Sequence, residues 1–342
     1  MTMEPSGRNV LGIVIAAAVL LTTAQVLGLI PGVVGAGTEL VATRLAGELP
    51  VTDPTSASWV GAAPLEVPLS GQTSVTPSNP VPSVDALEVR ALVNATHFAL
   101  RIAWDDETKD NRTTEVGEFR DAVAFQVAPP SQLPNLCMGA AGARMHIMQW
   151  KADWQADIEE GFWDLQDAFP NFWVDYYPYA IGEPPYTVPD AFPENASVYL
   201  VGYEVGNPFS QPLKVSPVED AVADGFYTIA TQPNQSALGR GVWDAGRWSV
   251  VISRLRDTGD PMDTPIAHGD IVAFAVWDGA SGDVGARKSV STWLTLSLGS
   301  GFEAQDPVLR LAAMTAVALV AAVALVLVWR RMKKPRGGSG GT

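Results

Sequence analysis

Between residues 84 and 300 the chain alternates short apolar runs with polar turns. The runs at 87–93 and 97–104 are separated by Asn94-Ala95-Thr96, and later turns occur at Asp244-Ala245-Gly246 and Asp278-Gly279. Short apolar runs bounded by Asn, Asp and Gly are typical of antiparallel strands joined by tight turns. Further strands are predicted at residues 122–127, 144–150, 197–203, 247–253, 271–277 and 289–298. The pattern predicts an all-β fold, an antiparallel β-sandwich over residues 84–300.

Two segments depart from this pattern. Residues 37–83 are rich in Gly, Pro, Ser and Thr, which predicts a linker into the first strand. Residues 153–193 gather Trp, Tyr and Pro, which predicts a loop-rich insertion with a short helix at about 157–167. Clustered aromatic side chains suit a flap over the sandwich, a partner-docking surface or a sugar platform. The pattern leaves these three roles open.

The C-terminal part of the chain predicts a membrane anchor. Leu311 to Trp329 contains no charged residue, and at 1.5 Å rise per residue this run just crosses the hydrocarbon core of a bilayer. Basic residues follow it directly, as in a stop-transfer sequence. We therefore predict a transmembrane helix at 308–330, in contact with lipid, and a basic cytoplasmic tail at 331–342.

Residues 1–36 are also apolar over most of their length. The apolar run from Val10 to Ile30 follows Arg8 and is longer than the core of an ordinary signal peptide, about 7–15 residues. The segment is either a removed signal peptide or an uncleaved anchor, and the sequence leaves both open. Either choice predicts a cell-membrane location with the main domain on the extracytoplasmic side.

The charge of the middle region excludes one class of partner. The whole chain has a formal charge of −15, and residues 37–307 contain 36 Asp and Glu against 15 Lys and Arg, a formal charge of −21. An acidic surface of this kind repels the phosphates of nucleic acids, so no nucleic-acid partner is expected.

Several common chemistries are excluded by residue type. The single cysteine, Cys137, allows no intramolecular disulfide, no CxxCH haem attachment and no Cys-ligated zinc or iron–sulfur site. The three histidines, His97, His146 and His268, lie in no nucleophile or zinc motif. We therefore predict no catalytic residues in this chain.

An ordered series of short motifs resembles a known family. Pro134-Asn135-Leu136-Cys137-Met138-Gly139 precedes a strand that ends in Gln149-Trp150-Lys151-Ala152-Asp153. The other matching stretches are Ala103-Trp104-Asp105-Asp106, Phe119-Arg120-Asp121-Ala122-Val123-Ala124, Val205-Gly206-Asn207-Pro208, Gly241-Val242-Trp243-Asp244 through Trp248-Ser249-Val250-Val251 with Arg254, and Phe274-Ala275-Val276-Trp277-Asp278-Gly279 leading to Lys288-Ser289-Val290-Ser291. Together they resemble the haem b (γ) subunit of type II DMSO-reductase-family molybdoenzymes. This group includes ethylbenzene and dimethylsulfide dehydrogenases and selenate and chlorate reductases.

The resemblance implies a β-sandwich that binds one non-covalent haem b and transfers electrons. It implies Met138 and Lys288 as the axial ligands of the haem iron. It also implies molybdopterin and iron–sulfur subunits, or another membrane redox protein, as partners. The chain departs from the family pattern at Arg144-Met145-His146-Ile147-Met148, where His146 is a second candidate ligand, and in its predicted membrane anchor.

The residues themselves leave the roles of both ligands open. A methionine flanked by apolar residues is usually a core filler, as Met138 would be. Lys288 shares its strand parity with Val290, Leu294 and Leu296, so it points inward if that face is the core. A lysine at a strand end can instead snorkel to the surface. The resemblance favours ligation, which requires a neutral amine because only the lone pair coordinates iron.

The alternative function from a different class is a carbohydrate-binding or adhesion β-sandwich module without haem. The aromatic insertion would then stack on sugar rings. An absorption spectrum separates the two hypotheses, because the alternative predicts a colourless protein.

Overall fold

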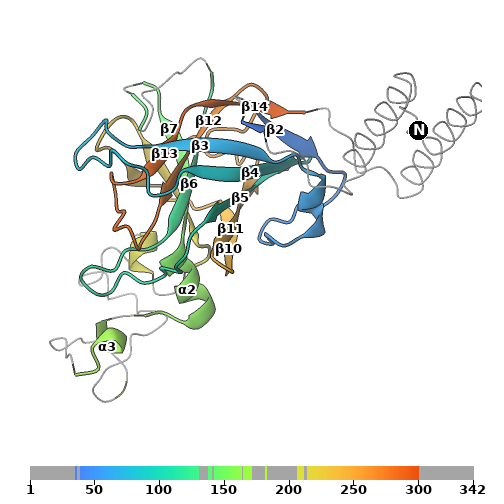
Figure 1. The fold of residues 1–342 in the computed structure, drawn as a ribbon. Coiled ribbons are helices and arrows are strands. Elements are labelled where there is room, and N and C mark those ends of the chain that lie inside the picture. The colour runs from blue at the N-terminus through green and yellow to red at the C-terminus, as the bar shows by residue number, and fades with distance from the viewer. Residues whose placement is uncertain are drawn as a thin grey trace, which may run out of the picture. The chain divides into compact units, whose positions relative to one another are not determined.

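The computed structural model describes residues 35–36, 39–130, 138–140, 142–163, 165–171, 182, 206–211 and 214–299 (Figure 1). Its strands are β1 (Gly35–Ala36), β2 (Glu39–Arg44), β3 (Leu65–Gly71), β4 (Ala86–Val93), β5 (His97–Asp105), β6 (Ala122–Ala128), β7 (Met145–Lys151), β8 (Val218–Ala223), β9 (Ala230–Thr231), β10 (Leu238–Asp244), β11 (Arg247–Leu255), β12 (Ile271–Trp277), β13 (Ser289–Ser291) and β14 (Leu294–Leu298). Its helices are η1 (Ala57–Gly61), α2 (Ala152–Glu160), α3 (Leu165–Ala168) and η3 (Pro208–Ser210).

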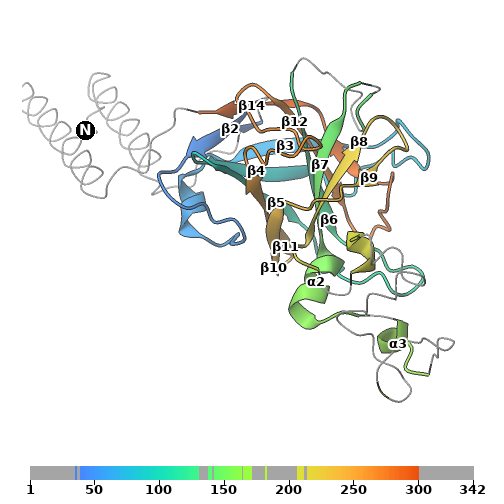
Figure 2. The ribbon, with the colours of Figure 1, turned by 180° about the vertical axis from the view of Figure 1, so that it is seen from behind.

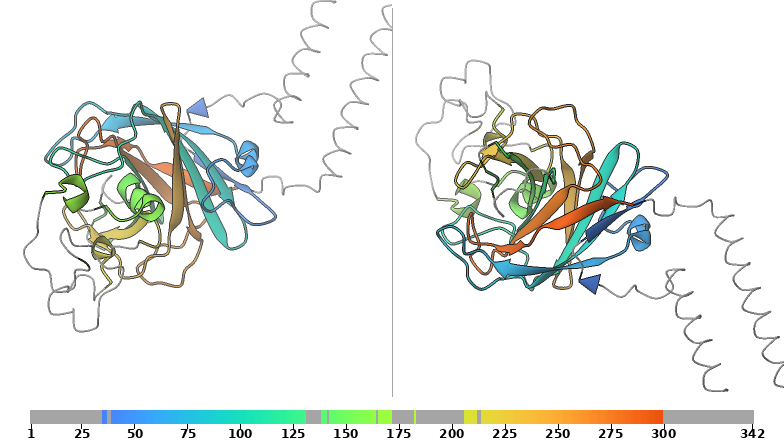
Figure 3. Two further views of the ribbon diagram at one scale, coloured as in Figure 1. Left: turned by 90° about the horizontal axis from the view of Figure 1, so that it is seen from below. Right: turned by 90° about the horizontal axis from the view of Figure 1, so that it is seen from above.

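The strands form one continuous hydrogen-bonded path that is arranged as two layers. The order along the path is β10-β11-β5-β4-β2-β14-β12-β6-β7-β8-β9, with β3 and β13 also paired to its members. Figure 2 shows β6, β7 and β8 beside one another in the second layer. The helix α2 lies against β10 at one end of the strands (Figure 3). The fold is therefore mostly β and sandwich-like, as predicted.

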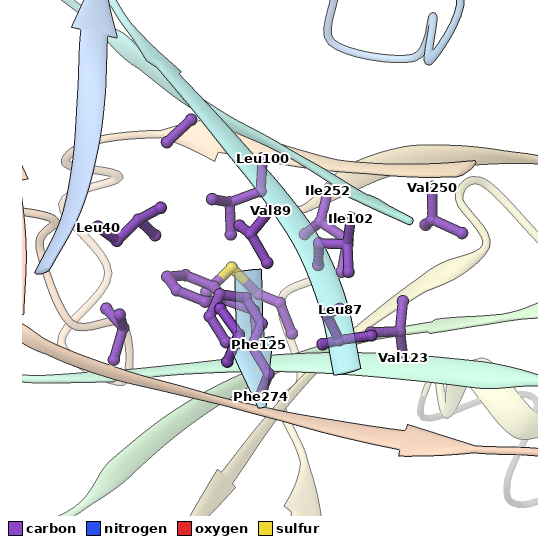
Figure 4. Close-up of a cluster of buried hydrophobic side chains, with 14 of the residues drawn as sticks. Leu40, Leu87, Val89, Leu100, Ile102, Val123, Phe125, Val250, Ile252 and Phe274 are labelled. Carbon is purple, nitrogen blue, oxygen red and sulfur yellow. The ribbon is translucent and has the colours of Figure 1, made fainter. Parts of the chain in front are cut away.

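The main hydrophobic core lies between the two layers. Side chains of β4 and β5, such as Leu87 and Ile102, point toward Val123, Phe125 and Phe274 of β6 and β12 (Figure 4). Burying one such side chain contributes about 1.5–3 kcal/mol, so this shared core explains why the two layers stay together. The outer face of the first layer is covered by a smaller cluster around Trp59 of η1.

Most neighbouring strands are antiparallel, but three pairs are parallel. These are β1 with β3, β2 with β4, and β14 with β2. Hairpin turns cannot produce such pairs, because parallel neighbours need a long crossover connection. The turn signals in the sequence therefore predict the hairpins and not these contacts.

The prediction of a linker at residues 37–83 is wrong. This segment contains β2 and β3, whose side chains Leu40, Ala42 and Val67 are fully buried in the main core. The Pro, Gly and Ser residues lie mainly in the loops that flank β3. The prediction relied on the Gly, Pro, Ser and Thr content of the whole segment. The alternation of buried and exposed positions in β2 and β3 covers only six and seven residues, so it contributes little to that average.

Several predicted strands agree closely with the structure, and others were missed. The predicted strands at 87–93, 97–104, 122–127, 144–150, 247–253 and 271–277 correspond to β4, β5, β6, β7, β11 and β12. The single strand predicted at 289–298 is divided into β13 and β14, and the strands β8 and β10 were not predicted.

The insertion predicted at residues 153–193 is described only in part. It begins inside α2, which starts before the predicted helix at 157–167 and ends at Gly161, where φ is 103°. A positive φ favours glycine and ends a helix readily.

Within the described ranges, no helix has the length and apolarity needed to cross a membrane. The strand predicted at 197–203, the transmembrane helix at 308–330 and the tail at 331–342 lie outside the described residues, as do residues 1–34. These remain predictions.

Candidate functional site

A cavity of about 530 Å³ opens on the outer face of the layer that contains β12, β6 and β7. Its volume is in the range of about 300–1,000 Å³ that is usual for small-molecule and cofactor sites. The floor comes from the strands, and loops at 113–120, 226–229 and 283–288 contribute the walls. The exposed residues Tyr227, Ile229 and Val284 lie on these walls, so the cavity reaches the surface.

The floor of the cavity consists mainly of small side chains. Ala122 and Ala124 of β6 lie beside Ala273 and Ala275 of β12, and Ala124 is directly paired with Ala275. Because successive side chains of a strand point to opposite faces, the larger residues between them enter the main core instead. The four alanines on neighbouring strands leave open space above the sheet, and Gln126, Ile147, Gln149 and Trp277 surround them on the floor.

Met138 lies where the chain enters this region, and it lines the cavity. The following residue, Gly139, has a φ of 72°, and a Cβ there would lie 2.7 Å from the carbonyl oxygens of Ala143 and Ala223. Only glycine fits at this position. The close backbone packing at Gly139 therefore fixes where Met138 enters the site, where it packs against the cluster that includes Met145.

Lys288 lies just before β13 and also lines the cavity. Its side chain is half-buried, and its Nζ lies 5.0 Å from the centroid of the Trp277 ring. Val290 faces the same cavity, as the shared parity predicted.

The predicted continuation of that face to Leu294 and Leu296 is wrong. Both leucines enter the main core, while Ser289 and Ser291 are the buried residues of β13. The Ser289 hydroxyl accepts hydrogen bonds from the backbone N–H groups of Ser83 and Val84, and so binds the loop before β4. The strand is interrupted at residues 292–293. After this break the even-numbered residues of β14 face the main core, whereas the even-numbered Val290 of β13 faces the cavity.

The structure thus brings Met138 and Lys288 to one cavity, although they are far apart in the sequence. A thioether and a neutral amine are both capable of binding haem iron, and the structure places one of each at this cavity. The volume of about 530 Å³ and the alanines on the floor leave room for a cofactor of this size. These residues therefore fit a haem.

The predicted alternative ligand, His146, lies elsewhere. It is fully buried, and its side chain does not line the cavity, because on β7 residues Ile147 and Gln149 face the cavity. His146 Nε2 lies 2.9 Å from Asp220 Oδ1, and His146 Nδ1 accepts a hydrogen bond from the backbone N–H of Thr264 at 3.4 Å. Both ring nitrogens are therefore engaged within the protein.

His146 and Asp220 form a buried charged cluster with Asp263 and Arg254. Burial alone would raise the pKa of Asp220, but the hydrogen bond from His146 and those from the backbone N–H groups of Ser236 and Ala237 outweigh it and lower the pKa. Arg254 lies 3.1 Å from Asp263. A metal bound at His146 Nε2 would require a proton on Nδ1, opposite the Thr264 N–H donor. The geometry therefore favours an ion-pair network over a metal site.

A second acidic cluster contains Asp106, Asp110, Asp121 and Asp278. Asp121 accepts hydrogen bonds from Trp248 Nε1 at 3.0 Å and from the backbone N–H groups of Asp110 and Gly279 at 2.7 and 2.9 Å. Burial raises the pKa of Asp121 to about 7. Carboxylate oxygens are the ligands that a hard cation prefers. Both oxygens of Asp121, however, already accept hydrogen bonds that join the start of β6 to β11 and to the loop after β12.

Residues that sequence reasoning missed include the alanine floor and Arg120, which lines the cavity wall. The signal for the floor was present in the sequence, because Ala122-Val123-Ala124-Phe125 and Ala273-Phe274-Ala275-Val276 both alternate small and large apolar residues. Arg120 lies in the matching stretch Phe119-Arg120-Asp121-Ala122-Val123-Ala124, but the resemblance gave it no role.

Comparison with known proteins supports the predicted resemblance. Residues 56–175 match the family described as ethylbenzene dehydrogenase. The resemblance to this family is confirmed. A protein of Haloferax mediterranei, named as a candidate respiratory nitrate reductase heme subunit (ORF7), is 25% identical over 277 residues, which is 78% of each chain.

Solved structures give only a weak likeness. A family 9 carbohydrate-binding module from Caldicellulosiruptor kristjanssonii in complex with glucose has a TM-score of 0.34 at 7% identity, covering 79% of this chain and 99% of its own. A carbohydrate-binding candidate from Bacteroides uniformis has a TM-score of 0.36 at 8% identity, covering 77% and 100%. TM-scores this low carry no argument about function.

Proposed function

We propose that the cavity binds one non-covalent haem b, with Met138 and Lys288 as axial ligands, and that the domain is an electron-transfer subunit without substrate chemistry of its own. The observation that carries this proposal is that both residues, chosen from sequence resemblance, line the same cavity. The related Haloferax protein, whose name includes a heme subunit, supports the choice of cofactor.

The residues around the cavity suit this role. Haem supplies reversible one-electron oxidation and reduction when bound. Met138 and Lys288 would hold the iron, and with both bound no position would remain open to oxygen or substrate. The alanines of β6 and β12 would contribute an apolar surround, which tunes the reduction potential of a bound haem. Tyr227, Ile229 and Val284 border the mouth, where a partner's redox centre could approach the haem edge.

The proposal extends to partners and location. The relative's name includes a respiratory nitrate reductase, and the family resemblance includes molybdoenzymes, so we propose association with molybdopterin and iron–sulfur subunits or with another membrane redox protein. The predicted helix at 308–330 would anchor the domain on the extracytoplasmic side of the cell membrane.

The test is an absorption spectrum of the full chain expressed with added haem. We expect a low-spin b-type spectrum after reduction with dithionite, and complete extraction of the haem by acid–acetone. Lys288→Ala should give a high-spin or water-ligated haem, because the amine is lost. Lys288→Met should keep six-coordinate haem with a shifted spectrum, because a second thioether replaces the amine.

Two outcomes would contradict the assignment. A colourless protein would favour the carbohydrate-binding alternative. A Lys288→Ala spectrum identical to that of the unaltered protein, together with loss of the low-spin signal in His146→Gln, would make His146 the ligand.

A further inference from the structure

We propose that Arg120 binds a propionate carboxylate of the haem and that Asp153 positions it. This inference rests on the proposed function, and it assigns the part of the site that recognises the charged edge of the cofactor. The positively charged residues among the described residues that line the cavity are Arg120 and Lys288. Lys288 is assigned to the iron, which leaves Arg120 as the cation for the cofactor's carboxylates.

The negative charge of the two haem propionates favours a positively charged residue beside them. Haem b has two propionates that are ionised at neutral pH, and a carboxylate that leaves water is costly unless a cation or hydrogen-bond donor replaces the solvent. The domain is strongly acidic, with a formal charge of −21 over residues 37–307. A carboxylate that binds here therefore needs a specific positive partner.

The position of Arg120 is fixed by its contacts. Its Nη1 donates to Asp153 Oδ2 at 2.6 Å, and the Thr113 hydroxyl donates to the same oxygen at 3.1 Å. The other oxygen, Asp153 Oδ1, accepts a hydrogen bond from the backbone N–H of Trp154 at 2.9 Å, at the start of α2. Asp153 is thus held on both oxygens and orients the guanidinium.

The rest of the guanidinium can bind a second carboxylate. A guanidinium has five N–H donors in a planar fork, which matches a carboxylate in two-point geometry. Within the described residues, Arg120 Nε and Nη2 donate no hydrogen bond, and the side chain is 27% exposed. Donors therefore remain free on the side chain that lines the cavity.

The carboxylate of Glu118 on the cavity wall already accepts hydrogen bonds from its own loop. Glu118 also lines the cavity, but its Oε2 accepts hydrogen bonds from the backbone N–H groups of Thr114 and Glu115 at 3.1 and 2.9 Å. These bonds hold the carboxylate within its own loop. Its exposure also weakens any repulsion of a propionate, because water screens the charge.

Arg112 is a matched control. It pairs with Glu160 through a 2.6 Å contact, and its side chain is 24% exposed, so it resembles Arg120 in pairing and exposure. Arg112 does not line the cavity. A loss of one surface ion pair should therefore affect both variants equally, and only Arg120 should affect propionate binding.

The experiment measures the affinity of the full chain for haem b and for haem b dimethyl ester, whose propionates carry no charge. We expect Arg120→Gln to weaken haem binding about 10- to 100-fold, the range for a hydrogen bond to a charged group, and to leave ester binding unchanged. Arg112→Gln should bind both ligands like the unaltered protein. Arg120→Lys should restore part of the preference for haem, and Asp153→Asn should reduce it.

The low-spin spectrum should be unchanged in Arg120→Gln, because the axial ligands are intact, and circular dichroism should show an unaltered fold. Equal weakening of haem and ester binding in Arg120→Gln would overturn the inference while leaving the haem proposal standing. Absence of binding of either ligand to the unaltered protein would overturn the proposed function itself.

Discussion

The two faces of β6 and β12 contain side chains of very different size. On the face toward the first layer, Phe125 packs against Phe98 and Phe274, with ring centroids 6.0 and 5.7 Å apart. On the opposite face, Ala124 and Ala275 leave a cavity of about 530 Å³. The strands and backbone are the same, so the small side chains at these positions, together with the loops that form the walls, leave the second face open as a binding site, although Trp277 also lies on that face.

The same division applies to the polar residues of the two faces. The packed face ends in Asp121, which is fully buried and holds three hydrogen bonds within the protein. The cavity face has Gln149 on its floor and Arg120 on its wall, and the described contacts of Arg120 leave N–H donors available there. Polar groups that are satisfied internally stabilise the fold, whereas donors left open in a cavity are available to a ligand.

The largest expected effect comes from truncating the packed face. Phe125→Ala removes a fully buried ring and should lower the free energy of unfolding by about 3–5 kcal/mol. Ile147→Ala, on the cavity face of β7, should cost less than half as much, because that side chain already borders empty space. Urea denaturation of the haem-free protein measures both. Equal costs would show that the two faces do not differ in packing.

The next effect comes from filling the cavity. Ala124→Leu should reduce haem affinity more than tenfold, because the added atoms occupy the floor on which the ring would lie, and it should leave the stability of the haem-free protein within about 1 kcal/mol. The control is Ala91→Leu, at a fully buried alanine of the main core, which should destabilise by about 1–3 kcal/mol. Tight haem binding by a folded Ala124→Leu protein would place the cofactor elsewhere.

A further effect, spread over several pH units, is a pH dependence of stability from Asp121. Burial raises the pKa of Asp121 to about 7, whereas an aspartate in the unfolded chain titrates near 3.9. Between these values the folded state binds more protons than the unfolded state, so this group makes stability fall as the pH rises from about 4 to 7.

Asp121→Asn should remove that contribution. The decline of stability with pH should become shallower by up to about 1.4 kcal/mol per pH unit over that range. Urea denaturation at several pH values gives the slope, and the difference between the two proteins isolates Asp121 from other carboxyls. Identical slopes would show that Asp121 is ionised in the folded protein throughout.

The sequence by itself determined the strands whose signals are local. In β4, β5, β6, β7, β11 and β12 the apolar runs and the turns between them lie within a few residues, so they could be predicted. The resemblance also directed attention to Met138 and Lys288, and the alternation of Ala with Val or Phe in β6 and β12 was visible beforehand.

The tertiary structure decided which residues meet. The strands β2 and β3 became part of the sheet because partners distant in sequence supply their hydrogen bonds, as in the pairing of Ala42 with Ala91. Parity placed Lys288 on one face of its strand, but whether that face is core or cavity depends on how the chain continues at residues 292–293. Local pattern specifies the two faces of a strand, and only packing against other layers decides which face is filled and which stays open.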